Sequence, residues 1–320
     1  MSHSCLSIPK KSVPVHNPKA VPSGNSASLR RLGWICAVFA GASYGTNPLW
    51  AHFLYADGMN VHSVLFYRFS LALAGFGVLL FRKRIGVHVP WRDFGWLVLL
   101  GVLMAISSIS LFSSFQYIDT GLACTLLFVY PLMVALLSAV FFHERMGWLT
   151  WLALFVALPG IWLLSNPGKG AAFNMKGFWL VMASSLSYAL YMILIHRTSA
   201  GKQPAELISF YAALFCAISI YLHSFFSTGT VLQAIPSVAD WWYSIGLAFF
   251  PTVISLFTMA VAIRYVGSTP TAIIGALEPL TAVFIGVLFF GEAFTVRYAV
   301  GIVLILAAVT TVVVSSGRED

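Results

Sequence analysis

Apolar runs of about twenty residues, separated by short polar stretches, make up most of the sequence after its first thirty residues. A helix of that length crosses about 30 Å of hydrocarbon. The pattern predicts ten membrane-spanning helices, called spans 1 to 10 below, near 33–54, 62–81, 95–115, 121–142, 147–165, 177–197, 205–226, 241–262, 269–290 and 296–315. We therefore expect an all-α polytopic membrane protein with ten transmembrane helices and both chain ends on one side of the bilayer.

The chain divides into four parts by this pattern. Residues 1–32 are an N-terminal tail, rich in Pro, Ser, Asn and Lys, whose composition is typical of disorder because it cannot bury enough apolar surface. Residues 33–165 and 177–315 are each predicted to form five helices. Residues 316–320 form a short C-terminal end.

Composition and charge narrow the class of protein. The chain is 59% hydrophobic and 9% charged, with a mean hydropathy of +0.89, which excludes a soluble domain and a disordered chain. The net charge of +8 could suit nucleic acid, but the basic residues lie between apolar runs instead of on one hydrated face. We therefore expect the lipid bilayer as a partner, and no nucleic acid.

The basic residues are distributed unequally between the two sides of the membrane. One side holds Lys10, Lys11, Lys19, Arg30, Arg31, Arg82, Lys83, Arg84, Arg92, Arg145, Arg197, Lys202, Arg264 and Arg318. The other side holds Lys169, Lys176 and Arg297. Because cytoplasmic loops are enriched in Lys and Arg, both termini are predicted to be cytoplasmic.

The two five-span parts repeat one another. Tyr130-Pro131-Leu132 and Phe141-Phe142-His143-Glu144 return 148 residues later as Glu278-Pro279-Leu280 and Phe289-Phe290-Gly291-Glu292. Earlier in each part the spacing is 144, so that Gly33 matches Gly177 and Ser43-Tyr44 matches Ser187-Tyr188. Since five is an odd number of spans, the repeats are inverted in the membrane, an architecture typical of carriers with a site between the halves.

Two ionisable side chains, Arg68 and Glu278, are predicted to lie well inside spans. Each costs about 3 kcal/mol on insertion scales, and such charges usually face a cavity or a partner. Arg68 either braces the spans through an ion pair or carbonyl contacts, or binds the substrate or a gate. Glu278, near the midplane of span 9, is a candidate for proton coupling, for binding a substrate amine, or for a structural pair that could include Arg68.

Further polar groups and prolines accompany these charges. The remaining substrate-binding candidates are Tyr44, Asn47, Tyr130 and Tyr188, with hydrogen bonding between helices as the alternative role. Pro131 and Pro279 occupy matching places in spans 4 and 9 and are predicted to kink them, because proline removes a backbone donor and frees a carbonyl. Paired kinks mark a midplane site in many carriers, although each can also be a fixed bend.

Other chemistry is not indicated. Glu144 and Glu292 precede spans 5 and 10 and are expected to cap helix ends. The four cysteines are scattered without metal-ligand spacing, so that no metal site is predicted. GxxxxGKS and HExxH motifs are absent from the sequence, which predicts neither a cofactor nor an enzyme.

The ordered motifs resemble those of the drug/metabolite transporter superfamily, in particular its ten-span EamA-type carriers. The matching residues are Gly45-Thr46-Asn47-Pro48, Tyr67-Arg68-Phe69, Tyr130-Pro131, Glu144, Leu277-Glu278-Pro279-Leu280 and Gly291-Glu292. The resemblance implies secondary transport of small metabolites, often amino acids or related compounds moving outward, by alternating access in a bacterial inner membrane. A coupling proton is the expected partner if Glu278 titrates.

The sequence departs from that family in two places. His143 stands where a small residue usually precedes Glu144, and span 9 lacks the basic pair that sugar-phosphate carriers of the superfamily use. The second departure disfavours phosphorylated substrates. A nucleotide-sugar or phosphometabolite exchanger is one alternative, and a membrane sensor or assembly factor without transport is another.

Overall fold

The computed structural model describes residues 26–142, 147–165, 174–228, 232–266, 271 and 274–316, and every regular element among them is helical. The helices are α1 (Ser26–Tyr44), α2 (Asn47–Ala56), α3 (Val61–Lys83), α4 (Trp91–Ser114), α5 (Thr120–Leu127), α6 (Tyr130–Phe142), α7 (Trp148–Ser165), α8 (Met175–Arg197), α9 (Ala205–His223), α10 (Val238–Ala248), α11 (Ser255–Val266), α13 (Leu277–Phe290) and α14 (Val296–Ser316). A short 3-10 turn, η1 (Ser199–Lys202), precedes α9. Two π-helical turns, η2 (Ser224–Thr228) and η3 (Phe249–Ile254), follow α9 and α10. The all-α prediction is confirmed.

The helices follow the ten predicted spans. Spans 1 and 4 are each broken in two, as α1 with α2 and as α5 with α6, and η3 interrupts span 8 between α10 and α11. Among the described residues, six helical segments are long and apolar enough to cross a membrane by themselves. The protein is therefore a multi-pass membrane protein.

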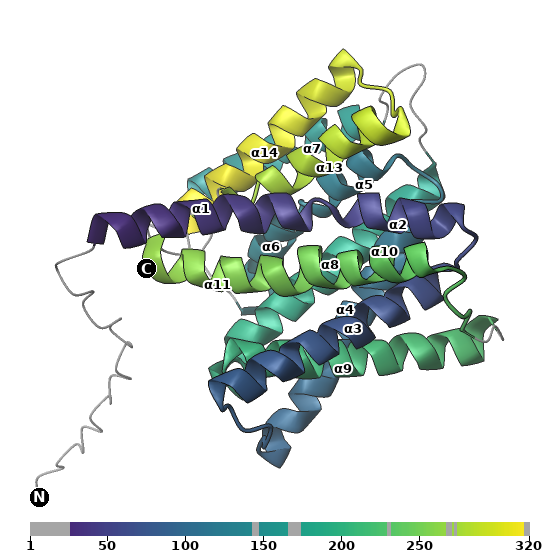
Figure 1. The fold of residues 1–320 in the computed structure, drawn as a ribbon. Coiled ribbons are helices and arrows are strands. Elements are labelled where there is room, and N and C mark those ends of the chain that lie inside the picture. Colours follow the sequence, from purple (N-terminus) through teal and green to yellow (C-terminus); the bar gives the residue numbers. More distant parts are fainter. Residues whose placement is uncertain are drawn as a thin grey trace, which may run out of the picture.

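The two halves pack against each other span by span. Span 1 lies against span 8, span 2 against span 7, span 3 against span 6, span 4 against span 9 and span 5 against span 10. In Figure 1, α5, α7, α13 and α14 gather on one side of α1, while α3, α4 and α9 lie on the other. Exchanging the halves maps this set of pairs onto itself, which is the arrangement expected of inverted repeats.

Individual contacts obey the same exchange. A Cβ atom added to Gly33 would lie 2.9 Å from Cβ of Tyr265, and one added to Gly177 would lie 2.9 Å from Cβ of Tyr117. Gly33 and Gly177 are repeat mates, as are Tyr117 and Tyr265. Glycine at both places lets a span pack closely on its partner from the other half.

Hydroxyl groups join the same pairs of spans. Ser255 Oγ donates to the Ala40 carbonyl at 3.0 Å, and Ser184 Oγ donates to the Ser107 carbonyl at 2.8 Å. Ser255 is the repeat mate of Ser107, and Ser184 is that of Ala40. The donating serine lies on span 8 in the first pair and on span 6 in the second, and each bond ties a span of one half to its partner in the other half.

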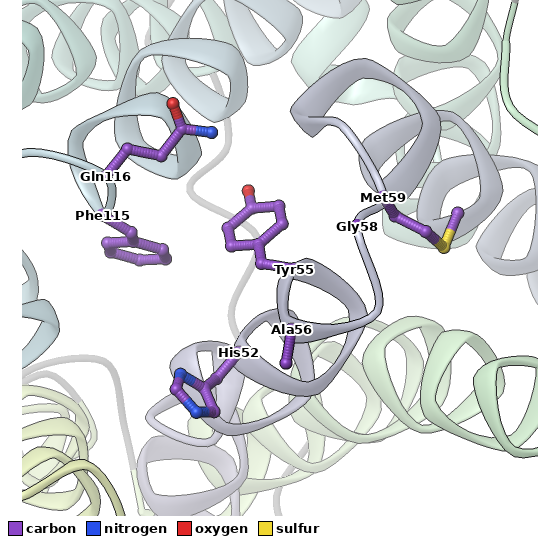
Figure 2. Close-up of a pocket in the computed structure, with 7 residues that line it drawn as sticks. All are labelled: His52, Tyr55, Ala56, Gly58, Met59, Phe115 and Gln116. Atoms are coloured by element: carbon purple, nitrogen blue, oxygen red, sulfur yellow. The ribbon is translucent and has the colours of Figure 1, made fainter.

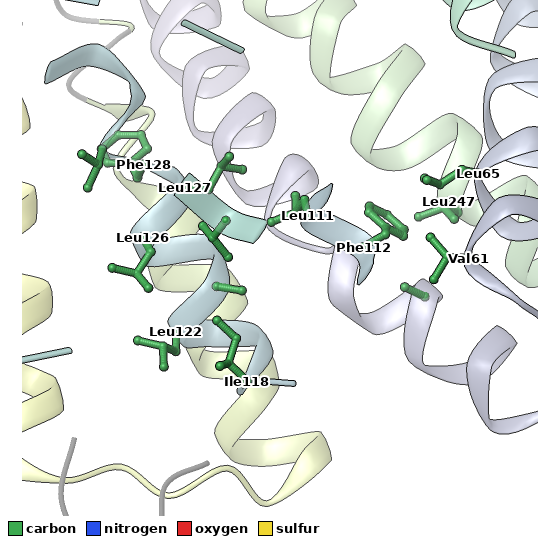
Figure 3. Packing of buried hydrophobic residues seen from close by; sticks show 14 of the residues in the cluster. Val61, Leu65, Leu111, Phe112, Ile118, Leu122, Leu126, Leu127, Phe128 and Leu247 are labelled. Atoms are coloured by element: carbon green, nitrogen blue, oxygen red, sulfur yellow. The ribbon is translucent and has the colours of Figure 1, made fainter. Parts of the chain in front are cut away.

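The hydrophobic core fills the space between the halves. It extends from Val61 and Leu65 on α3 through Phe112 on α4 to Leu126 on α5 and Leu247 on α10 (Figure 3). The outward surface stays apolar, with Trp91 and Trp148 86% and 71% exposed. Such a surface suits contact with lipid, and it is incompatible with water on all sides.

We refer to the two ends of the bundle as the N-terminal end, where α1 begins, and the far end, where α2 ends and α3 begins. The far end contains the loop between spans 1 and 2, whereas the N-terminal end contains the loop between spans 6 and 7. These two loops are equivalent under the exchange of halves.

Candidate functional site

Spans 1 and 9 cross at the centre of the molecule, close to the point where each span is broken. The chain turns at Gly45 and Thr46 between α1 and α2, and at Gly275 and Ala276 before α13. A Cβ atom on Gly45 would lie 2.5 Å from the Glu278 carbonyl oxygen and 2.6 Å from Cβ of Thr281. Only glycine allows an approach this close. The Gly45-Thr46-Asn47-Pro48 and Leu277-Glu278-Pro279-Leu280 motifs therefore meet directly, and Glu278 lies beside the end of α1.

The carbonyl groups that prolines deprive of a donor are bound by other groups of the protein. Pro48 cannot donate to the Tyr44 carbonyl, and Asn47 Nδ2 donates to it at 2.9 Å instead. Pro131 likewise leaves the Leu127 carbonyl, which accepts from Ser185 Oγ of span 6 at 3.1 Å. The free carbonyl that the sequence predicts at the Pro131 kink is therefore not available, and neither is the Tyr44 carbonyl released by Pro48.

The break in span 9 is arranged in the same way. Pro279 cannot donate to the Gly275 carbonyl, and the backbone N–H of Glu278 donates to it at 2.9 Å. The turn at Gly275 directly precedes the Leu277-Glu278-Pro279 segment. Residues 269, 270, 272 and 273, which belong to the predicted span 9, lie outside the described part of the chain.

Arg68 is buried in the interior, with 5% of its surface exposed. Its Nε donates to Thr252 Oγ1 at 3.2 Å, and its side chain also lies close to that of Tyr44. The guanidinium carbon lies 5.2 Å and 5.3 Å from the ring centres of Phe69 and Phe112. The side chain therefore does not extend to the membrane surface but is held among neutral and aromatic groups.

Glu278 lies among tyrosines contributed by spans from both halves. The hydroxyl groups of Tyr44, Tyr130 and Tyr188 all interact electrostatically with its carboxyl group. The ring of Tyr188 stands edge-on to that of Tyr130 at 4.8 Å and stacks on that of Tyr191 at 5.8 Å. Glu278, Tyr44, Tyr130 and Tyr188 each keep part of their surface accessible, which Asn47 and Arg68 do not.

Arg68 and Glu278 do not form an ion pair with each other. An ion pair does join Lys83 to Glu206, at the N-terminal end. Tyr44 instead acts on both charged groups, because its hydroxyl is within electrostatic range of Glu278 and of Arg68. The direct Arg68–Glu278 pair, which the sequence left open, is thus not formed. Tyr44 interacts with both groups instead.

Asn47 is placed differently from the other candidates. It is 2% exposed, and its Nδ2 is occupied by the Tyr44 carbonyl. Its Oδ1 has no hydrogen-bond partner among the described residues. The Asn47 amide therefore stabilises the break in span 1, and its Oδ1 is a buried acceptor without a partner among the described residues.

A cavity of about 430 Å³ opens at the far end, and its walls are α2, the following loop and the end of span 3. Figure 2 shows the ring of Tyr55 reaching from α2 toward Phe115 and Gln116. Tyr55 also donates to the Phe112 carbonyl at 3.3 Å and acts electrostatically on Arg68. The cavity floor thus adjoins the side chains around Arg68.

The structure describes one of the two residues that are predicted to cap helix ends. Glu144 and its neighbour His143 lie outside the described residues. The Glu292 carboxylate accepts from the N–H of Thr120 at 2.6 Å, from the Thr120 hydroxyl at 2.6 Å and from the N–H of Gly121 at 3.1 Å. It therefore caps α5 in the other half, and the prediction that it caps the helix after it in sequence is wrong.

Several residues of the site were not found from the sequence. Thr252 and Ser185 are ordinary polar residues of apolar spans, and their partners are 184 and 58 residues away. Pro251 in span 8 was a usable signal, since η3 places Thr252 opposite Arg68. Cys124 and Cys216 are free and buried, and no group of three metal-ligating side chains occurs in the described part of the chain.

Inverted five-helix repeats, broken spans that meet at the centre and a polar cluster between the halves define a membrane carrier. Two matches to the EamA-like transporter family, over residues 31–166 and 175–314, cover most of the sequence. The chain belongs to this family. It is a membrane transporter and not an enzyme.

Relatives agree with this assignment. The chain is 30% identical to an uncharacterized transporter of Archaeoglobus fulgidus over 66% of its own length and 73% of that protein. It is 24% identical to the uncharacterized transporter YdfC of Bacillus subtilis, over 75% and 78% of the two chains. A solved crystal structure superposes with a TM-score of 0.60 over 92% of this chain and 99% of the other, at 17% identity. That last similarity concerns the fold alone.

Proposed function

We propose that this transporter is a secondary carrier that exports small zwitterionic metabolites, such as amino acids or related compounds, by alternating access. The observation that carries the proposal is the position of Tyr44, whose hydroxyl acts on both Arg68 and Glu278. A cation and a carboxyl group therefore both lie within electrostatic range of one hydroxyl in the interior. This spacing suits a small molecule that carries both charges.

Each part of the cluster has a role toward such a substrate. The partners of Arg68 are a threonine, a tyrosine and two aromatic rings, so an incoming carboxylate would supply the countercharge that the described contacts do not. Glu278 would bind the ammonium group or exchange a proton with it. Tyr130 and Tyr188, stacked edge to face, would contact the remainder of the substrate.

Access to the cluster is proposed to alternate between the two ends. The cavity at the far end reaches Tyr55, which neighbours Arg68, and this route would serve the outward-open state. Because all major span pairs join one half to the other, a rocking of the halves would close one end while opening its equivalent. The proposed rocking motion does not require a bound nucleotide.

The asymmetry of Lys and Arg supports an orientation with the N-terminal end and both termini in the cytoplasm of a bacterial cell, the far end facing outward. Reporters fused after residue 320 and within the loop at 84–90 should then read cytoplasmic, whereas a reporter near 170 should read external. An external C-terminus would contradict the proposed orientation.

Counterflow of a labelled amino acid into proteoliposomes tests the function. We expect uptake by the wild-type protein and a loss of about tenfold or more in Arg68→Ala and Glu278→Gln, which corresponds to about 1.4 kcal/mol or more. Arg82→Ala is the matched control, since Arg82 lies on the same helix but is exposed, and it should transport normally.

The alternatives give different results in the same assay. Counterflow of nucleotide sugars or phosphorylated metabolites, but not of amino acids, would favour the exchanger. No counterflow of any class would favour a sensor or assembly factor. If Glu278→Gln transports normally from about pH 5 to about pH 8, the proton-coupling role of Glu278 is excluded.

A further inference from the structure

One residue of the loop between spans 7 and 8 is hydrogen-bonded through all four of its polar groups. The Gln233 backbone N–H donates to Ser63 Oγ at 2.8 Å, and its carbonyl accepts from the Tyr67 hydroxyl at 3.1 Å. Its Oε1 accepts from the backbone N–H of Asn60 at 2.6 Å, and its Nε2 donates to the Gly58 carbonyl at 3.4 Å. Every partner belongs to the first half of the protein, whereas Gln233 belongs to the second.

These bonds hold a segment that forms part of the wall of the far-end cavity. Gly58 and Met59 line the cavity, and Gln233 binds the residues on either side of Met59. Gln233 itself is exposed, so that water can replace its bonds when they break. Contacts that open in every transport cycle are expected to be of this weak, solvent-exposed kind. We refer to Gln233 and its four partners as the far-end latch.

A bond of the same kind occurs at the N-terminal end. The Tyr211 hydroxyl donates to the Val87 carbonyl at 2.6 Å. Tyr211 is the repeat mate of Tyr67, and Val87 lies in the loop after span 2, which is equivalent to the loop of Gln233 after span 7. A tyrosine of one half thus binds a loop carbonyl of the other half at each end of the molecule.

The loop between spans 6 and 7 is also bound to the first half, but by different groups from those at the far end. Ser199 Oγ donates to Asp93 Oδ1, and Gln203 Nε2 donates to Asp93 Oδ2 at 2.9 Å. We refer to these contacts, together with the bond from Tyr211 to Val87, as the N-terminal latch. Hydrogen bonds to an ionised carboxylate are stronger than bonds between neutral groups, which make up the far-end latch. The far-end latch is therefore the weaker of the two.

We propose that the far-end latch is the gate of the far end of the carrier and that the N-terminal latch is its counterpart, so that the two open in turn. Breaking the bonds of Gln233 frees the loop between spans 1 and 2 and widens the mouth of the cavity. Since its bonds are the weaker set, the far end opens more readily than the N-terminal end. The role of the latches rests on the alternating access of the proposed function.

The far-end latch is connected to the central cluster through α3. Tyr67 directly precedes Arg68, whose Nε binds Thr252 of span 8. A substrate carboxylate that draws the Arg68 guanidinium toward itself would act on the same turn of α3 that carries the Tyr67 hydroxyl. Substrate binding is therefore expected to change how readily the latch opens.

Two variants test the gate, because they make the same chemical change at equivalent places. Tyr67→Phe removes the hydroxyl from the far-end latch, and Tyr211→Phe removes it from the N-terminal latch. A cysteine added at one end reports its opening: Met59→Cys at the far end, or Ala200→Cys in the loop that the N-terminal latch binds. The replaced side chains are 4% and 0% exposed. The rate of labelling by a hydrophilic maleimide is measured on the purified full-length protein in detergent, and the protein without the added cysteine gives the background.

The two variants should act in opposite directions. Tyr67→Phe should make the labelling of Met59→Cys about fivefold faster, as expected for the loss of one typical hydrogen bond, and that of Ala200→Cys slower. Tyr211→Phe should do the reverse. Gln233→Ala removes two side-chain bonds of the far-end latch, so it should change both rates in the same direction as Tyr67→Phe and by more.

Three results would overturn the proposal. Unchanged labelling in all variants would show that the bonds do not control access. Faster labelling of both added cysteines in the same variant would indicate a general loosening of the fold. Faster labelling at the altered end without slower labelling at the opposite end would make each bond only a local tie of its loop.

Counterflow separates this inference from the proposed function. A protein that shows no counterflow of amino acids can still show the reciprocal labelling of its two ends. A transporting protein without reciprocal labelling would retain the proposed function and lose this inference.

Discussion

Arg68 on span 2 donates a hydrogen bond from its Nε to Thr252 Oγ1 on span 8, at 3.2 Å and across 184 residues of sequence. The two residues belong to different halves of the protein. Thr252 lies in η3, where the wider π-helical turn and Pro251 interrupt the regular helix. The buried cation is therefore fixed to the partner half by an irregular turn.

Replacing Thr252 tests this fixation. Thr252→Val removes the acceptor at nearly constant volume and should destabilise the protein by about 1.5–3 kcal/mol, because a buried charged donor loses its partner. Thr252→Ser retains the hydroxyl and should recover most of this loss. Denaturant unfolding in detergent measures both variants, and equal stability of Val and Ser at this position would show that the bond contributes nothing.

The absence of a direct ion pair between Arg68 and Glu278 gives a second prediction. Without substrate, Arg68→Ala and Glu278→Gln should show only weak coupling in unfolding free energy, because the two groups are not in contact and share only Tyr44 as a neighbour. With a bound amino acid the same cycle should become non-additive, because the ligand would join the two sites. Strong coupling in the ligand-free protein would mean that the charges interact directly.

Ser185 and Pro131 are expected to be coupled through the Leu127 carbonyl. Ser185→Ala should cost about 1–3 kcal/mol, because it leaves this buried acceptor unsatisfied. In a Pro131→Ala background residue 131 regains its N–H and can donate to the same carbonyl, so the cost of Ser185→Ala should shrink. Thermal unfolding of the four proteins measures this cycle, and an undiminished cost would refute the coupling.

Gly45 provides a packing test at the crossing of spans 1 and 9. Gly45→Ala places a methyl group 2.5 Å from the Glu278 carbonyl oxygen, and such overpacking typically costs about 1–3 kcal/mol. Gly95→Ala is the control, since nothing lies near its added Cβ, and should be neutral or stabilise α4 by about 0.5–1 kcal/mol. The two melting temperatures should therefore move in opposite directions or differ clearly in size. A Gly45→Ala protein as stable as Gly95→Ala would contradict the close crossing.

The sequence by itself determined the ten spans and the inverted repeat. Both signals are local or periodic: length and apolarity identify a span, and the return of Pro131 as Pro279 aligns the halves. The sequence also singled out Arg68 and Glu278, because a charge inside an apolar run is costly wherever it points. These inferences needed no knowledge of which spans touch.

Only the tertiary structure decided the partners of these residues. It put Thr252 against Arg68, Ser185 on the carbonyl released by Pro131, and Glu292 on the N-terminus of α5. Hydrogen bonds and charge contacts act over a few ångströms, and in a helical membrane protein that proximity depends on how each span is rotated and which span it packs against, which the apolar pattern does not specify.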